Sequence, residues 1–199
     1  MNHSVRPIYI GLMSRFCHAA LVIIDMQKAI DADYHAVHGP RNNLDAESKI
    51  ARLLAKWRNE QLLIIHVRHD SAFPNSAYRP GQEGNNFKEE VKPLYGETIV
   101  SKTTNSAFIG TRLEEILRAS GIHSLVVAGV STNNSVEATV RMAGNLGFDT
   151  YLVGDACFTF AKPDYNGRLR SANEVHAMAL ANLDDEYCSV VDTDTVLES

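Results

Sequence analysis

Short apolar runs alternate with amphipathic segments along most of the chain. Runs rich in β-branched residues indicate buried strands, whereas apolar residues spaced three and four apart indicate helices. Because strands and helices follow one another in turn, the pattern predicts an α/β fold with a parallel sheet and helices on both faces. The expected strands are residues 20–25, 61–67, 97–102, 124–130 and 150–156, with a last strand and tail at 187–197; the expected helices are 45–59, 111–119, 134–146 and 171–183.

No linker, internal repeat or low-complexity tract interrupts this pattern, so the 199 residues are expected to form one domain, 1–199. Residues 1–18 hold only a brief apolar run that ends before Arg15 and His18. We interpret this segment as an N-terminal arm, at the surface or in an oligomer contact, and not as a signal peptide.

Polar residues follow three of the expected strands. Asp25 ends the first strand, Lys102 ends the third, and Ser135 comes just after the fourth. Open parallel sheets bind ligands at the carboxyl ends of their strands. We therefore expect a carboxylate, an ammonium group and a hydroxyl to meet in one crevice, where Asp25 would be a competent general base. Asp25 and Lys102 are expected at the carboxyl ends of adjacent strands, within hydrogen-bond distance of each other.

Each of these residues also has a purely structural interpretation. Asp25 could cap a helix or form a turn, and a lysine at a strand end is usually solvated. The small polar residues 131–134 could simply cap the helix that follows, since Asn134 and Glu137 have the spacing of a capping box. Capping accounts for one or two of these residues. It does not account for their occurrence together with Asp25 and Lys102 at strand ends.

Composition narrows the range of partners. The chain is 45% hydrophobic, which is enough for a core, and its formal net charge of -5 argues against nucleic acid as a partner. No apolar stretch is long enough to span a bilayer. The cysteines are odd in number and far apart, at Cys17, Cys157 and Cys188. We therefore expect a cytoplasmic protein without a disulfide framework.

No metal or cofactor is expected. His66, His69 and Asp70 lack an established ligand spacing, and residues three apart on a strand face opposite sides. His35 and His38 lie in a polar loop and are expected at the surface. Neither a dinucleotide-binding motif nor a phosphate-binding loop is present, and the G-x-S-x-G pattern of a nucleophile elbow is not completed.

Four segments carry a resemblance that covers residues 20–192. They are LVIIDMQ, KTTNSAF, GVSTNNSVEATVRMAGNLGF and VGDAC. Together they resemble the isochorismatase-like, or cysteine hydrolase, superfamily. This resemblance implies a three-layer α/β/α sandwich with a parallel six-stranded sheet, and a homodimer or larger homo-oligomer. It also implies an Asp-Lys-Cys triad, in which Asp25 and Lys102 match the first two members.

The chain departs from the family at the third member, because Ser135 stands at the cysteine position. The serine could be an engineered replacement, or it could mark a natural serine variant or a non-catalytic homologue. A third explanation is that the chain resembles the isochorismatases proper, some of which work without the cysteine. The resemblance further implies a cis peptide bond between Val130 and Ser131. The amides of Ser131 and Ser135 would then form an oxyanion hole.

These observations favour a hydrolase that cleaves an amide C–N bond of a small molecule. Two alternatives stay open: a vinyl-ether hydrolase of the isochorismatase type, and a binding protein without catalysis. Substrate contacts are expected from Gln27, Phe108 and Asn133, and specificity is expected to depend on the loops at 31–43 and 70–92.

Overall fold

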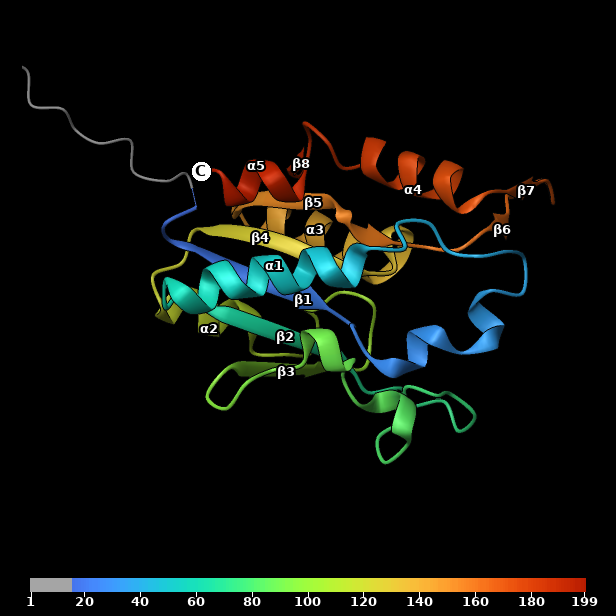
Figure 1. Ribbon diagram of the computed structural model, residues 1–199, viewed down its shortest axis with the longest axis horizontal. Helices are drawn as coiled ribbons and strands as arrows, with labels where there is room; N and C mark the ends of the chain where they lie inside the picture. Colours follow the sequence, from blue (N-terminus) through green and yellow to red (C-terminus); the bar gives the residue numbers. More distant parts are fainter. Residues whose placement is uncertain (1–15) are drawn as a thin grey trace, which may run out of the picture.

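The computed structural model describes residues 16–199, and a six-stranded sheet forms its centre (Figure 1). The strand order is β3-β2-β1-β4-β5-β8, and all neighbouring strands run parallel, which confirms the predicted α/β architecture. The strands are β1 (Ala19–Ile24), β2 (Ile64–His69), β3 (Thr98–Lys102), β4 (Ser124–Val130), β5 (Asp149–Phe158) and β8 (Ser189–Val191).

Helices cover both faces of the sheet and give the expected three layers. Side chains of β1 alternate between the faces, so that Leu21 and Ile23 pack in a cluster with α1 and α5, while Val22 and Ile24 pack in a second cluster with α2 and α3. The helices are α1 (Ala46–Asn59), α2 (Leu113–Ala119), α3 (Glu137–Asn145), α4 (Ala172–Ala181) and α5 (Thr193–Leu197).

Short elements fill the connections at the carboxyl ends of the strands. They are the 3-10 turns η1 (Lys28–Asp31), η2 (Asp33–His35), η3 (Glu83–Asn85) and η4 (Glu89–Val91), the π-helical turn η5 (Thr132–Val136), and a small hairpin of β6 (Lys162–Pro163) and β7 (Leu169–Arg170).

Strand β4 passes very close to β1 at Gly129. This residue has φ +127°, and a Cβ atom there would lie 2.2 Å from the carbonyl oxygen of Ile24. Only glycine allows that approach and that backbone conformation. The contact holds the end of β1 against β4 immediately before Asp25.

Two predicted elements differ from the structure. The last strand is short, and the tail forms α5 instead, because the Asp192 side chain accepts a hydrogen bond from the Thr195 amide and caps a helix. After β4 the chain first makes the wide η5 turn, so α3 begins only at Glu137, and Asn134 forms no capping box with it.

The N-terminal arm expected at residues 1–18 falls largely on residues 1–15, which lie outside the described residues. Phe16 is buried and packs edge-on against Tyr151, with ring centroids 5.0 Å apart. Within residues 16–199, no helix is both long and apolar enough to cross a membrane.

Candidate active site

Three buried polar side chains meet beyond the carboxyl ends of the strands. Asp25 follows β1, Lys102 ends β3, and Ser135 lies in the η5 turn after β4. The Lys102 Nζ atom lies 2.7 Å from Asp25 Oδ2 and 3.2 Å from Ser135 Oγ. The structure thus brings together the three residues to which the sequence pointed.

The expectation that Asp25 and Lys102 come from adjacent strands is wrong, because β2 lies between β1 and β3. Neighbouring strands are about 4.8 Å apart, so the two residues start from strands separated by about 10 Å. The long stem of a lysine bridges this distance across the end of β2, where His69 is its register partner. A shorter basic side chain would not reach the carboxylate.

The Asp25 carboxylate is desolvated but not fully hydrogen-bonded. Burial raises its pKa, and the Lys102 ammonium and the Ser135 hydroxyl offset only part of this rise. Lys102 holds Oδ2, whereas Oδ1 is buried without a hydrogen-bond partner in the described part of the chain. One carboxylate oxygen is therefore fixed, and the other is available to exchange a proton.

A cavity of about 240 Å³ opens above these groups. Its walls come from the loops after β1, β2 and β3 and from the η5 turn, so it lies at the edge of the sheet where ligands bind α/β folds. The lining residues are Asp25, Tyr34, His35, His69, Ser71, Phe73, Ser76, Tyr78, Asn105, Val130, Ser131, Asn134 and Ser135.

Two histidines in this wall were not among the expected site residues. His35 was expected at the surface, but it lines the cavity and stacks on Phe160, with ring centroids 5.6 Å apart. His69 packs edge-on against Tyr78 at 5.6 Å. Burial lowers the pKa of both imidazoles. The available signal was their place beyond or at a strand end: His35 lies in the loop after β1, and His69 is the last residue of β2.

None of the three expected substrate contacts lines the cavity. The Gln27 amide is buried against the backbone of His69, with its Oε1 accepting from the His69 amide at 2.7 Å. Phe108 packs on Phe148, at a centroid distance of 5.8 Å. Asn133 Oδ1 accepts a hydrogen bond from the Thr159 hydroxyl. Its neighbour Asn134 lies in the wall instead.

The two histidines of β2, His66 and His69, lie in different surroundings. His66 Nε2 lies 2.8 Å from Glu97 Oε2, away from the cavity that His69 lines. Asp70 accepts a hydrogen bond from Asn85 at 2.9 Å. Across residues 16–199, no group of three or more histidine, cysteine or acidic side chains has the arrangement of a metal site.

The peptide bond between Val130 and Ser131 is cis. It joins β4 to the η5 turn, so Ser131 and Ser135 both line the cavity from the same short segment.

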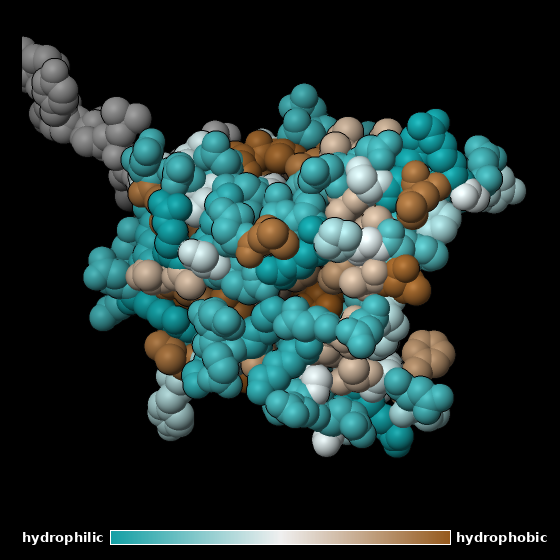
Figure 2. Space-filling model, turned by 45° about the vertical axis from the view of Figure 1, so that its right-hand side comes forward, coloured by the Kyte–Doolittle hydropathy of each residue, from teal (hydrophilic) through white to brown (hydrophobic). Residues whose placement is uncertain are grey.

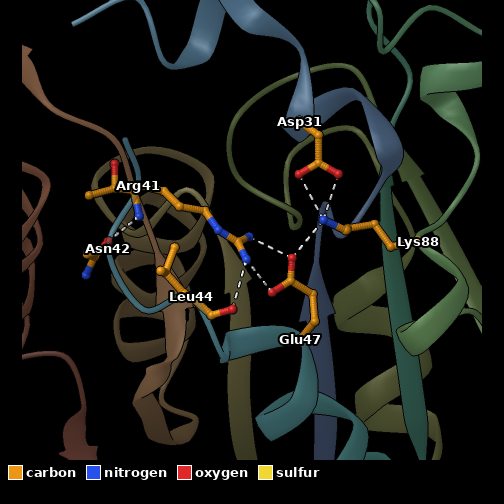
Figure 3. Close-up of polar contacts among 7 residues, drawn as sticks. Asp31, Arg41, Asn42, Leu44, Glu47 and Lys88 are labelled. Carbon is orange, nitrogen blue, oxygen red and sulfur yellow. Dashed lines mark hydrogen bonds and ion pairs between the residues drawn. The ribbon is translucent and has the colours of Figure 1, made fainter. Parts of the chain in front are cut away.

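A network of charged side chains around the buried Glu47 connects the two loops that supply most of the cavity wall (Figure 3). The Arg41 guanidinium donates to both carboxylate oxygens of Glu47, at 2.6 and 2.7 Å. Lys88 donates to Glu47 at 2.7 Å and also to Asp31. Burial would raise the pKa of Glu47, but its hydrogen bonds from Arg41 and Lys88 outweigh this effect and lower the pKa to about 2. The network fixes both loops to the start of α1.

Comparison with known proteins places this site in a family. The family model of the isochorismatase domain matches residues 19–195, from β1 into α5. The chain belongs to the isochorismatase family. The similarity therefore includes all three segments that supply Asp25, Lys102 and Ser135.

Several relatives support this assignment. The isochorismatase family protein YrdC of Bacillus subtilis is 43% identical over 178 residues, which cover 89% of this chain and 94% of YrdC. The streptothricin hydrolase of Streptomyces noursei is 33% identical and covers 84% of this chain and 60% of its own length. Nicotinamidase 3 of Arabidopsis thaliana is 28% identical, with coverages of 91% and 88%.

A solved structure agrees closely with the fold. The crystal structure of an isochorismatase-family protein from Chromobacterium violaceum is 57% identical and superposes with a TM-score of 0.89, covering 96% of this chain and 97% of the other. The isochorismatase family includes hydrolases that act on small molecules and on amide-type bonds.

Proposed function

We propose that the protein hydrolyses an amide C–N bond of a small molecule and that Asp25, Lys102 and Ser135 carry the reaction. The observation that supports this most directly is the contact of Lys102 Nζ with both Asp25 Oδ2 and Ser135 Oγ at the base of the cavity. A carboxylate beside a hydroxyl is the pairing of a general base with a nucleophile.

In the proposed reaction, Asp25 takes the proton of the Ser135 hydroxyl as Oγ attacks the amide carbonyl. The tetrahedral oxyanion is stabilised by the backbone amides of Ser131 and Ser135. Collapse of this intermediate breaks the C–N bond, and Asp25 returns the proton to the leaving amine. Water then cleaves the acyl-serine ester, and Asp25 again acts first as base and then as acid. Lys102 stabilises the ionised carboxylate.

Serine makes the first step difficult. A thiol is far more acidic than an alcohol, and thiolates are the stronger nucleophiles at neutral pH. We therefore expect the S135C variant to hydrolyse small amides at least 100-fold faster than the present chain, with the gain in kcat rather than in KM. Release of ammonia from a panel of primary amides measures the effect.

A matched S135A variant provides the control, because it keeps the cavity but removes the nucleophile. Equal rates for the S135C variant, the S135A variant and the present chain would contradict nucleophilic attack from residue 135. Ligand binding without turnover in all three would favour a non-catalytic binding protein.

One observation favours a second candidate, the vinyl-ether hydrolysis of isochorismatase-type enzymes. In that reaction a carboxylic acid protonates the substrate, and burial raises the pKa of Asp25 in the direction that such an acid requires. Here the S135C change would have little effect, while isochorismate would release pyruvate. Measuring ammonia and pyruvate with the same variants separates the two reactions.

We also propose that the enzyme is a homodimer or larger homo-oligomer. An open groove of about 670 Å³ runs along α4, where Met178 is 64% exposed. Asn133 lines this groove, next to Asn134 of the cavity wall, and Arg170 in the groove pairs with Asp164 and Glu174. Light scattering during size-exclusion chromatography measures the mass.

The cysteines, which are all unpaired, support a reducing compartment such as the cytoplasm.

A further inference from the structure

We propose that the cavity selects small amides that carry no charge and rejects analogues of the same shape that carry a carboxylate. This selection follows from how the charged groups around the cavity are already paired. Turnover of such amides rests on the function proposed above, but the preference in binding does not.

The lysine beside the cavity has no donor left for a ligand. An ammonium group has three N–H donors, and Lys102 uses them on Asp25, on Ser135 and on the carbonyl oxygen of Thr104, at 2.7, 3.2 and 3.1 Å. No arginine or other lysine is among the described residues that line the cavity. A carboxylate entering it would therefore meet no free cation.

Among the residues of 16–199 that line the cavity, the only formally charged group is itself negative. Asp25 lines the cavity and uses only its Oδ2 atom to bond Lys102, so an incoming anion would lose its hydration and lie near a like charge. The two imidazoles of the wall do not compensate, since burial lowers their pKa and keeps them neutral near pH 7.

Unpartnered polar atoms in the wall suit a neutral ligand. His35 Nε2 and His69 Nδ1 are buried and have no hydrogen-bond partner in the described part of the chain. Buried groups without a partner are costly, and an amide offers both a carbonyl acceptor and N–H donors. A neutral amide entering beside these imidazoles brings hydrogen-bonding groups without introducing a charge.

The cavity volume limits the size of the ligand. A water molecule occupies about 30 Å³ of liquid, so 240 Å³ corresponds to roughly eight water-sized groups. Succinamide and succinamate have the same size and shape and differ only in an amide against a carboxylate. This pair tests charge without changing volume.

The experiment measures affinity for both compounds by calorimetry with the present chain, and kcat/KM for both with the S135C variant. We expect succinamide to be favoured over succinamate by at least 100-fold in both measurements. Equal values, or a preference for succinamate, would overturn the proposal. Absence of binding and turnover for both would overturn it as well, since the proposed size would then be wrong.

A single added cation provides the second test. Phe73 lines the cavity but is 77% exposed, so F73R places a guanidinium at the mouth without disturbing the core. We expect it to reduce the preference for succinamide at least tenfold. Y95R is the matched control, because Tyr95 is fully exposed and does not line the cavity.

An equal shift in both variants would show that net charge, not the cavity, sets the preference. The two proposals can also fail separately. If the S135C variant hydrolyses no amide but still binds succinamide preferentially, the proposed function is wrong and the selectivity stands.

Discussion

At the scale of single residues, Asp25 is the most constrained position of the site. Its φ is +51°, in the left-handed region that most residues avoid, and Asp and Asn tolerate this region better than other non-glycine residues. The backbone conformation turns the chain out of β1 so that the carboxylate meets Lys102. The same position thus sets both the direction of the loop and the charge of the site.

This dual role makes D25N an informative substitution. Asparagine keeps the shape and tolerates the left-handed backbone, but its neutral amide cannot accept the proton of the nucleophile. We expect kcat of the S135C enzyme to fall by about 100- to 10,000-fold, the usual contribution of a general base. Stopped assays of ammonia release measure it.

Thermal unfolding of the same variant serves as the control: the variant should still be folded at the assay temperature, with a melting temperature below that of the parent because Lys102 loses its buried carboxylate partner. Retained activity with normal folding would remove Asp25 from the proposed mechanism.

At the scale of elements, the cavity depends on two loops that have little regular structure. One follows β1 and supplies Tyr34 and His35, and the other follows β2 and supplies the wall from Ser71 to Tyr78. The network of Arg41, Glu47 and Lys88 fastens both to α1 (Figure 3). The position of the wall is therefore set by contacts made away from the cavity itself.

Lys88 is one of the residues that join the two loops: its side chain bonds Asp31 of the first loop and Glu47 of α1, and Lys28 pairs with Glu83 beside it. In the K88M variant this connection is lost, and a charge-assisted hydrogen bond of this kind contributes about 2 kcal/mol. We expect a lower melting temperature and a KM raised several-fold, with a smaller change in kcat.

The matched control is K92M, because the side chain of Lys92 forms an exposed ion pair with Glu89, and such pairs contribute about 0–1 kcal/mol. If K88M and K92M behave alike, the network does not hold the cavity wall.

At the scale of the whole molecule, the charges define a pH range for stability. Hydrophobic residues lie singly or in small groups among hydrophilic ones on the face seen in Figure 2. Two partly buried carboxylates, Glu47 and Glu97, have their pKa lowered from 4.5 to about 2 by hydrogen bonds that outweigh the effect of burial. Arg58 is the main partner of Glu97.

A lowered carboxyl pKa stabilises the folded state above the pKa of the unfolded chain, and this contribution is lost as the pH falls toward 2. We expect the melting temperature to decrease modestly from pH 7 to 5, because His35 and His69 have lowered pKa values and protonate more readily in the unfolded chain, and to fall steeply between pH 4.5 and 2. The E47Q variant should show a shallower fall.

E115Q is the comparison, because Glu115 forms an exposed pair with Arg112 that solvent screens. A slope unchanged in E47Q would mean that Glu47 is not among the groups that link stability to pH.

Much of this architecture could be predicted from the sequence. The strands were visible because they are short apolar runs, and β4 was located at its observed bounds, Ser124–Val130. Strand ends and the family resemblance pointed to Asp25, Lys102 and Ser135, because parallel strands present their carboxyl ends at one edge. The order of the strands is not encoded locally, which is why β2 was not expected between β1 and β3.

The cavity wall could not be predicted in the same way. The ring of His35 is positioned by Phe160, more than a hundred residues later in the chain, and no local pattern reports such a contact. Asn133 and Asn134 are neighbours of similar chemistry, and only the η5 turn decides which of them lines the cavity. Loop conformation follows from long-range packing, whereas strands follow from local composition.

The Gln27 side chain extends the hydrogen bonding between β1 and β2. The last backbone bond between β1 and β2 runs from the Asp25 amide to the carbonyl oxygen of Val67. Two residues further on, the Gln27 side chain forms the next two hydrogen bonds with the His69 backbone. Its Nε2 atom donates to the His69 carbonyl oxygen at 3.0 Å, and its Oε1 atom accepts from the His69 amide at 2.7 Å. A side-chain amide here imitates a peptide group, so the sheet gains one more rung after the main chain has left it. The backbone of β1 is free to turn toward the cavity because a side chain has taken over its place in the ladder.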